Sequence, residues 1–341
     1  LTAQEPEGIT PTQRASDKAT LLRAMQECLR HGITSVVNMD GNLYQADLLK
    51  ELAQDGLPLN VSLPMTLVPG QSPARRAELL RAAAQAPVGR LSFGRVKMFM
   101  DGVFDTWTAF RTDDYPRKAG FRSAPLFDAE EFAQICIEAD ALGLQIAVHA
   151  VGDGAVRATL DGYAAARAKN GPRDARHRIE HIDMIHPDDL PRLAALGVVA
   201  SMQPVHPPGL AGLPLEPTVS IMGQARWKDT FPWRAIKDQG VVLAYGTDWP
   251  VSPLSPLHAL HCALSRQPWG QGQPDQRLTL GEALDAYASA GSYALFTENL
   301  RGQIAVGMRA DVVLLRGDVQ GLALRPDAVE IVGVYVDGEQ A

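Results

Sequence analysis

Short apolar runs of strand length alternate with amphipathic stretches through most of the chain. Residues 17–29 carry apolar groups at helical spacing, and Gly32 follows them as a residue that commonly ends a helix. The β-branched run at 33–38 comes directly afterwards and has the length of a strand. The same helix-then-strand unit recurs, so we expect a fold built from alternating helices and strands.

The pattern predicts strands near residues 35, 61, 98, 147, 180, 200 and 244. Helices are predicted at 17–29, 47–54, 74–85, 129–142, 155–169 and 233–239, with another that starts after His186. Continuously apolar strands joined by helices indicate a parallel sheet with helices on both faces. A closed (β/α)₈ barrel and an open doubly wound sheet both satisfy this pattern.

Polar residues near the carboxyl ends of five different strands favour the barrel. They are Lys97, His149, His181, Gln203 and Asp248. A TIM-type barrel collects its site from many strands, whereas an open sheet concentrates it at one switch point. We therefore predict a (β/α)₈ TIM-type barrel over residues 1–300, with its first strand missing from the sequence.

The texture changes at residues 301–341, where short apolar segments are split by glycine and aspartate turns. We expect strands at 302–311, 312–315 and 329–336. So few strands leave edges and a face that need a partner. This region is therefore predicted to be the C-terminal portion of a small β-sandwich domain.

Composition narrows the class of protein. The formal net charge is −7, and no basic run appears, which argues against nucleic acid or an anionic membrane as a partner. No apolar run reaches the roughly 18 residues of a membrane span. Cys28, Cys136 and Cys262 are few and far apart, as reduced core thiols are, so we expect a cytoplasmic protein. Because no initiating Met is present, we expect the chain to begin inside a longer protein.

His149 and His181 are the candidate centre of a metal site. Each ends a short apolar run, and Asp248 lies in the turn formed by residues 246–250. Two neutral imidazoles and a carboxylate can hold Zn²⁺ and leave a position for water. A lone strand-end histidine is more often a hydrogen-bonded core residue, but two on successive strands, together with Asp248, favour the metal site.

Lys97 is unexpected in the apolar strand near residue 98, because burial of an ammonium group is unfavourable without a partner. One interpretation is an ion pair with Asp101 or Asp105, and another is an outward-facing lysine on a strand edge. A third is that CO₂ carboxylates the amine, which would then bridge two metal ions.

Six ordered motifs resemble the amidohydrolase superfamily, specifically its family 3 (YtcJ-like) branch. They cover residues 96–102, 148–155, 178–181, 201–204, 246–251 and 302–311. The resemblance implies a metal-dependent barrel hydrolase of C–N bonds that binds Zn²⁺ or another divalent ion, with one or two ions per site. It further implies that Lys97 is the carboxylated bridge, that His149 and His181 hold one metal, and that Asp248 is both ligand and general base.

One motif of that family is missing. Its members open the barrel with a His-X-His pair on the first strand, and no such pair occurs among the 8 histidines of this chain. The run at 33–38 aligns with the family's second strand. Either the chain is a piece of a longer protein or it is a degenerate relative. The absence of an initiating Met and the incomplete C-terminal sandwich favour the first expectation.

The expected reaction is attack of a metal-bound hydroxide on an amide, formamide, carbamate or cyclic amide of a small molecule, with Asp248 as the base. The alternatives are a catalytically impaired barrel that binds a small molecule and a metal-dependent esterase or lactonase. We expect Asp101, Asp153 and Glu180 to support the metal ligands. The candidate substrate contacts are Trp107, Gln203, His206 and Trp249.

The loop at residues 104–122 is a candidate lid over the site, or else a solvated insertion. The segment at 204–222 is expected to form the opposite wall or a mobile crossover. A homodimer is compatible with the sequence.

Overall fold

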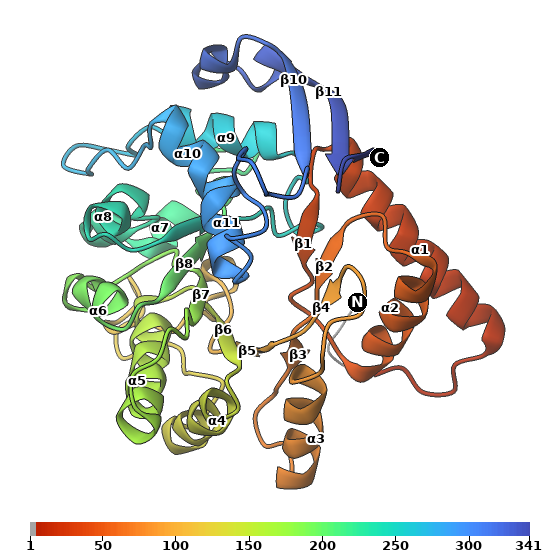
Figure 1. Ribbon diagram of the computed structural model, residues 1–341. Helices are drawn as coiled ribbons and strands as arrows, with labels where there is room; N and C mark the ends of the chain where they lie inside the picture. The colour runs from red at the N-terminus through yellow and green to blue at the C-terminus, as the bar shows by residue number, and fades with distance from the viewer. Residues whose placement is uncertain (1–4) are drawn as a thin grey trace.

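The computed structural model describes residues 5–341, and it contains a parallel α/β assembly followed by a small antiparallel sheet (Figure 1). The strands are β1 (Ser35–Val37), β2 (Asn60–Ser62), β3 (Met65–Thr66), β4 (Leu91–Ser92), β5 (Arg95–Phe99), β6 (Gln145–Ala150), β7 (Arg178–His181), β8 (Val199–Met202), β9 (Leu243–Tyr245), β10 (Val312–Gly317), β11 (Val329–Val336) and β12 (Glu339–Gln340). The helices are α1 (Pro11–Arg30), α2 (Leu43–Asp55), α3 (Pro73–Ala83), α4 (Ala129–Ala141), α5 (Asp153–Asn170), α6 (Leu190–Ala195), α7 (Thr218–Met222), α8 (Trp233–Asp238), α9 (Pro256–Ser265), α10 (Leu280–Tyr287) and α11 (Ser289–Ala294).

The parallel strands follow one another in sequence order. One sheet runs β1-β2-β4 and the other runs β3-β5-β6-β7-β8-β9, and every pairing in both is parallel. Because β2 leads into β3 and β4 leads into β5 after only two residues each, the two sheets form a continuous path. Helices α4, α5 and α6 lie outside β5 to β8 in Figure 1. The predicted barrel-type α/β architecture is thus confirmed.

All seven predicted strands are present, but one of them is interrupted. The segment predicted as one strand near residue 61 becomes β2 and β3, separated by Leu63 and Pro64. Proline lacks a backbone N–H, so it cannot continue a central ladder. Within residues 5–341, β1 pairs only with β2, and β9 pairs only with β8.

Several helices begin at a residue whose side chain accepts a hydrogen bond from a backbone N–H group in the first turn. Asn42 accepts from the N–H of Gln45, so α2 begins earlier than residue 47, where we expected it. Thr279 and Glu282 form a capping box at the start of α10. Such capping groups fix the start of a helix more exactly than hydrophobic periodicity does.

The C-terminal sheet has the order β10-β11-β12 and is antiparallel. The strand predicted at 302–311 is wrong: the segment is irregular, because Gly302 and Gly307 take φ values of 94° and 92° that turn the chain. Polar contacts attach this region to the barrel. Asn60 donates to Asp311 over 3.0 Å, and Arg90 pairs with Asp337 over 3.0 Å.

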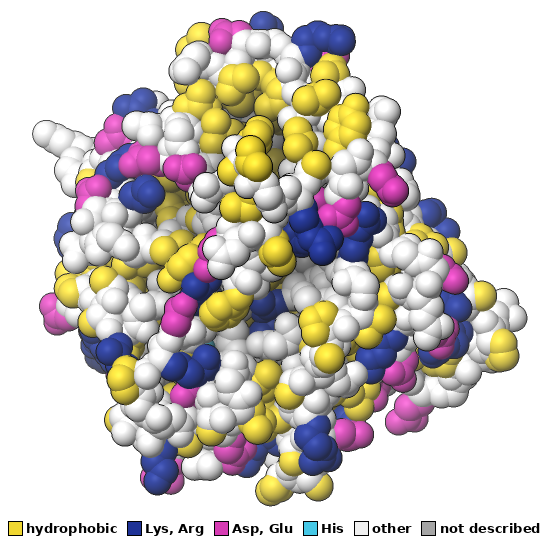
Figure 2. All heavy atoms as spheres, in the orientation of Figure 1, with side chains coloured by type: hydrophobic (Ala, Val, Ile, Leu, Met, Phe, Trp, Pro, Cys, Tyr) yellow, Lys and Arg dark blue, Asp and Glu magenta, His cyan; other side chains and the backbone are white. Residues whose placement is uncertain are grey.

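Hydrophobic side chains gather on the surface over β10 and β11, near the top of Figure 2. Exposed side chains of this region include Leu314, Leu324 and Val332. The extensive core surrounds the parallel strands and their helices, and it also includes Val329, Val334 and Val336 on the inner face of β11. No helix in the described part of the chain combines the length and the apolar character needed to cross a bilayer.

Candidate metal centre

His149 and His181 lie side by side at the carboxyl ends of β6 and β7. Their ring centroids are 4.5 Å apart, and both side chains are buried. His181 and Ile182 take φ values of 79° and 51°, a left-handed conformation that is especially unfavourable for a β-branched residue. The N–H of Ile182 donates to the carbonyl of Ala150 over 3.2 Å, which helps to hold this turn. The backbone after β7 is therefore strained at the residue that presents an imidazole to the site.

Gln203 orients the imidazole of His181. Its Oε1 lies 2.8 Å from Nδ1 of His181. Because an amide oxygen only accepts, Nδ1 carries the proton and the lone pair of Nε2 is available to a metal. The amide of His206 donates to the carbonyl of Gln203 over 3.1 Å, which closes a four-residue turn with Pro204 at its second position. The turn folds His206 back toward His181.

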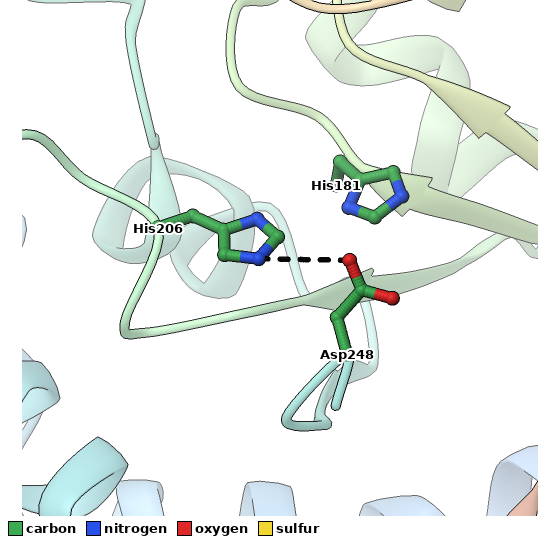
Figure 3. Close-up of side chains that lie close together, drawn as sticks. All are labelled: His181, His206 and Asp248. Atoms are coloured by element: carbon green, nitrogen blue, oxygen red, sulfur yellow. Dashed lines mark ion pairs between the residues drawn. The ribbon is translucent and has the colours of Figure 1, made fainter. Parts of the chain in front are cut away.

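Asp248 completes a group of three side chains that converge in Figure 3. One ligand atom each from His181, His206 and Asp248 lies within 4.8 Å of the other two. Nε2 of His206 is 3.6 Å from Oδ2 of Asp248 and 2.8 Å from Oγ of Ser252. Asp248 itself has a φ of 56°, which aspartate tolerates better than most residues. The donor set of two imidazoles and a carboxylate suits a divalent cation.

Burial sets the protonation of these groups. It lowers the pKa of His149 to about 3 and that of His206 to about 4, and it holds the pKa of His181 well below the usual value. The imidazoles are therefore neutral near pH 7, which is the form that binds metals. Burial raises the pKa of Asp248 to about 6, and Lys97 opposes this rise.

Lys97 is buried inside the barrel, with 2% of its surface exposed. Among residues 5–341 it forms no ion pair, so neither the predicted pair with Asp101 or Asp105 nor the outward-facing alternative is found. Its Nζ lies 4.6 Å from the ring centroid of Phe99. Burial lowers the pKa of the amine to about 8, against the opposing effect of Glu180. A large share of neutral amine is thus present at mildly alkaline pH.

Positive charge is in excess among the buried side chains near Lys97. Arg95 and Arg178 are both buried, and Arg178 donates to both carboxylate oxygens of Glu180 over 2.9 and 3.0 Å. Nη1 of Arg95 is buried without a hydrogen-bond partner. Glu180 therefore neutralises only one of these cations. The support of metal ligands that we predicted for Glu180 is not seen as a contact, since its carboxylate is taken up by Arg178.

The Asp101 carboxylate links backbone segments around His149 by hydrogen bonds. Its carboxylate accepts from the N–H groups of Phe110, Val151 and Gly152 over 2.8 to 3.0 Å. Oδ1 of Asp101 is 3.8 Å from Nε2 of His149. Burial raises the pKa of this carboxyl to about 7, although the three N–H groups act in the opposite direction. Asp101 thus lies beside the histidine that we expected it to support.

The loop at 104–122 is fixed to the turn after β6. The carbonyl of Phe110 accepts from the amides of Gly154 and Ala155 at the start of α5, over 2.9 and 3.2 Å. A Cβ on Gly152 would lie 2.1 Å from that carbonyl, and one on Gly154 would also collide with the loop. The glycines on both sides of Asp153 are therefore required by the close approach of this loop.

Asp153 does not contact the metal histidines, contrary to our expectation. Its carboxylate accepts from Thr112 and pairs with Arg226 over 2.8 Å. Arg226 also pairs with Asp113 and Asp229 over 2.9 and 2.8 Å. This network ties the middle of the loop at 104–122 to Asp153 and Arg226, and the role of the loop as a lid stays a prediction.

The two candidate tryptophans lie in different settings. Trp249 is 43% exposed beside Asp248. Trp107 is partly buried, 5.2 Å from Tyr115 between ring centroids, with Nζ of Lys118 over it at 3.6 Å. Their proposed contacts with a substrate stay predictions. Sequence reasoning did not anticipate Ser252 or Arg226, because neither follows a strand and neither lies in a recognisable motif.

A parallel barrel-type sheet with histidines and an aspartate at its strand ends defines a class of metal-dependent enzymes. A family model described as "Amidohydrolase family" matches residues 2–341. The chain therefore belongs to the amidohydrolase family, and the resemblance found in its motifs is confirmed.

Individual relatives agree with this assignment. The chain is 31% identical over 254 residues to Protein LONG AFTER FAR-RED 3 of Arabidopsis thaliana, covering 73% of this chain and 43% of the relative. It is 27% identical over 251 residues to an N-substituted formamide deformylase of Arthrobacter pascens, covering 72% of this chain and 45% of the relative. It thus spans somewhat less than half the length of these curated relatives.

The architecture is similar to that of a solved hydrolase. A crystal structure of an uncharacterized metal-dependent hydrolase from Pyrococcus horikoshii OT3 superposes with a TM-score of 0.76 at 25% identity. The similarity covers 90% of this chain and 61% of the other.

Proposed function

We propose that this chain carries the metal-dependent hydrolysis of a C–N bond in a small amide-like molecule. The observation that carries the proposal is the convergence of neutral, buried imidazoles and Asp248 at the carboxyl ends of the strands. When bound, a divalent cation would polarise a carbonyl and lower the pKa of water. His149, His181 and Asp248 are the ligands that the family resemblance implies.

The residues of this chain supply the remaining chemistry. Asp248 would take a proton from the attacking water and return it to the leaving nitrogen, as a carboxylate with a pKa of about 6 can do near neutral pH. The fixed loop at 104–122 would exclude water from one side of the substrate. The formamide deformylase among the relatives supports an amide-like substrate class.

The setting of Lys97 supports its carboxylation. A carbamate would replace a positive charge by a negative one, beside the two buried arginines that Glu180 balances only in part. Because no acidic side chain pairs with Lys97 in the described residues, no native ion pair would have to break. The proposal thus includes a carboxylated Lys97 as a metal ligand.

The experiment measures metal content and hydrolysis together. After loading with Zn²⁺ and bicarbonate, the protein should bind about one or two equivalents and hydrolyse members of a panel of N-substituted formamides, amides and carbamates. Less than a tenth of an equivalent would contradict the proposal, and turnover of esters and lactones alone would redirect it. Lys97→Ala should lower the metal content and be partly rescued by short-chain carboxylates.

A further inference from the structure

We propose that the interior of the barrel binds a small monovalent inorganic anion, a halide or bicarbonate, against the guanidinium group of Arg95. This anion site lies toward the amino ends of the strands, on the other side of Lys97 from the candidate metal centre. Its donors are Nη1 of Arg95 and the hydroxyl of Thr66. The site does not depend on the proposed hydrolysis, because anion binding can be measured without metal or substrate.

The strand register places the relevant side chains on one face of the sheet. Arg95 and Lys97 are two residues apart on β5, so their side chains share the interior face. Thr66 on β3 is the register partner of Lys97. Ala147 on β6 is also a partner of Lys97, and Arg178 on β7 is in turn the partner of Ala147. All of these side chains are buried, so they meet inside the barrel and not on its helical side.

Arg95 is a buried cation without an anionic partner. Its Nε donates to Oε1 of Gln145 over 2.9 Å, but its Nη1 has no hydrogen-bond partner in the described part of the chain. The carboxylate of Glu180 is taken up by Arg178, over 2.9 and 3.0 Å. The two arginines therefore share one carboxylate, whatever the charge of Lys97. A buried water molecule would satisfy Nη1, but only an anion also offsets the charge.

The same region carries small side chains and a second unpartnered donor. The interior positions of β6, β8 and β9 at this level are Ala147, Ser201 and Ala244, all of them buried. Large branched side chains ordinarily fill the interior of such a barrel. Oγ1 of Thr66 is also buried without a partner, and a hydroxyl can donate to an anion. Two donors beside small side chains suit an anion of a few atoms at most.

Carboxylation of Lys97 would compete with this anion, and this part of the inference rests on the proposed function. The lone pair of Nζ would form an N–C bond to CO₂, one C=O π bond would open onto oxygen, and a proton would leave Nζ for the solvent. The side chain would thereby become an anion. The carbamate and the free anion would offset the charge of the same arginines, so a high anion concentration should oppose carboxylation.

Thermal denaturation of the full chain at constant ionic strength tests the site. Replacing gluconate by bromide should raise the melting temperature of the wild type by about 2 °C or more. Arg95→Met removes the charge and should abolish the rise, and Arg95→Gln serves if the methionine variant does not fold. Arg30→Gln is the matched control, because Arg30 is exposed and pairs with Glu27 over 2.8 Å, and it should keep the rise. Equal rises in the wild type and Arg95→Met would overturn the inference.

Crystallography locates the anion directly. Bromide scatters X-rays anomalously, so a crystal grown in bromide should show an anomalous peak in contact with Nη1 of Arg95. A water molecule there without an anomalous peak would overturn the halide site. Bicarbonate in place of bromide then distinguishes the two sources. A rise in melting temperature with bicarbonate alone would assign the site to that oxyanion, and the absence of a rise with either anion would overturn the inference.

Carbon-13 NMR with labelled bicarbonate tests the competition. The carbamate signal, assigned by its loss in Lys97→Ala, should fall about 2-fold or more in the wild type as bromide replaces gluconate. A constant signal despite a bromide-dependent melting temperature would overturn the competition. A chain that forms no carbamate and binds no zinc contradicts the proposed function, whereas a chain that does both and shows no response to anions overturns the inference alone.

Discussion

The two halves of the site are built differently. On the β5–β7 half, His149 and His181 lie among the last residues of their strands β6 and β7, and the Asp101 carboxylate accepts three backbone hydrogen bonds around them. On the β8–β9 half, His206 and Asp248 are carried by turns beyond the strand ends. The Asp248 side chain is 35% exposed, whereas that of Asp101 is fully buried.

This difference separates two tasks. Buried, hydrogen-bonded groups on regular elements keep a fixed geometry, whereas loop residues can reach a ligand and change with it. The β5–β7 half therefore keeps the geometry of the site fixed, and the β8–β9 half supplies the side chains that adjust to a bound ligand. Apart from the proposed ligands His149 and His181, substitutions in the first half should mainly affect folding, and those in the second should mainly affect binding.

The largest effect is expected at Asp101. Asp101→Ala leaves three buried N–H groups without an acceptor, at about 1 to 3 kcal/mol for each lost partner, so the free energy of unfolding should fall by at least about 3 kcal/mol. Urea denaturation measures it. Asp101→Asn keeps one acceptor oxygen and should lose less; equal stability of Asp101→Ala and the wild type would refute the rigid-half description.

The next effect is expected at Arg226. Arg226→Ala leaves the fully buried Asp153 carboxylate without its cation and should lower the free energy of unfolding by about 3 kcal/mol. It should also loosen the loop at 104–122, so that limited trypsin digestion cuts faster after the exposed Arg117 and Lys118. Arg226→Lys, which keeps the charge, is the control. Unchanged digestion would mean that the loop is held by Phe110 and Asp101 alone.

A smaller effect, on binding instead of stability, is expected at Gln203. Gln203→Leu removes the acceptor that fixes the tautomer of His181 and should weaken zinc binding about 10- to 100-fold. Gln203→Glu keeps an acceptor and should retain most of the affinity. The measurement is a competition with a chromogenic chelator, and indistinguishable affinities for the leucine variant and the wild type would count against the orienting role.

The smallest effect is expected in the pH dependence of the free energy of unfolding, and it arises from Asp140, which lies outside the site. Hydrogen bonds from His177, Asn170 and Arg173 lower the pKa of Asp140, against the effect of burial. The contribution of the Asp140 carboxylate to the free energy of unfolding is therefore present above the unfolded pKa of about 3.9, and it is lost as the pH falls below that value. Between pH 5 and pH 3, the wild type should lose about 1 kcal/mol more than Asp140→Asn does, measured by denaturation at each pH. Parallel pH profiles would contradict this.

The strands, their order and the β5–β7 half could be predicted from the sequence. Apolar runs that end on His149 and His181 carry this information locally, because a buried strand needs continuous apolar residues and its end projects the next polar group. The tail was harder to predict: the apolar residues of 302–311 suggest a strand, but Ile304 is 93% exposed and the glycine turns break the segment.

The convergence of His206 with His181 could not be predicted from spacing alone. It depends on the turn that starts at Gln203 and on the path of the chain after β9, and both are set by contacts between distant residues. The role of Asp153 was missed for the same reason, since its partner Arg226 lies 73 residues away. Local pattern shows that these residues are polar and close to strand ends, but not which partner each one meets.

The four-residue turn from Gln203 to His206 also restricts how the chain can change in length. Both ends of this turn contact the imidazole of His181. The side chain of Gln203 hydrogen-bonds to it, and the ring of His206 stacks against it. A single inserted or deleted residue would rotate one end away while the other stayed on β8. Length variation should therefore be tolerated after residue 207, in the stretch that leads to α7, and not within the turn.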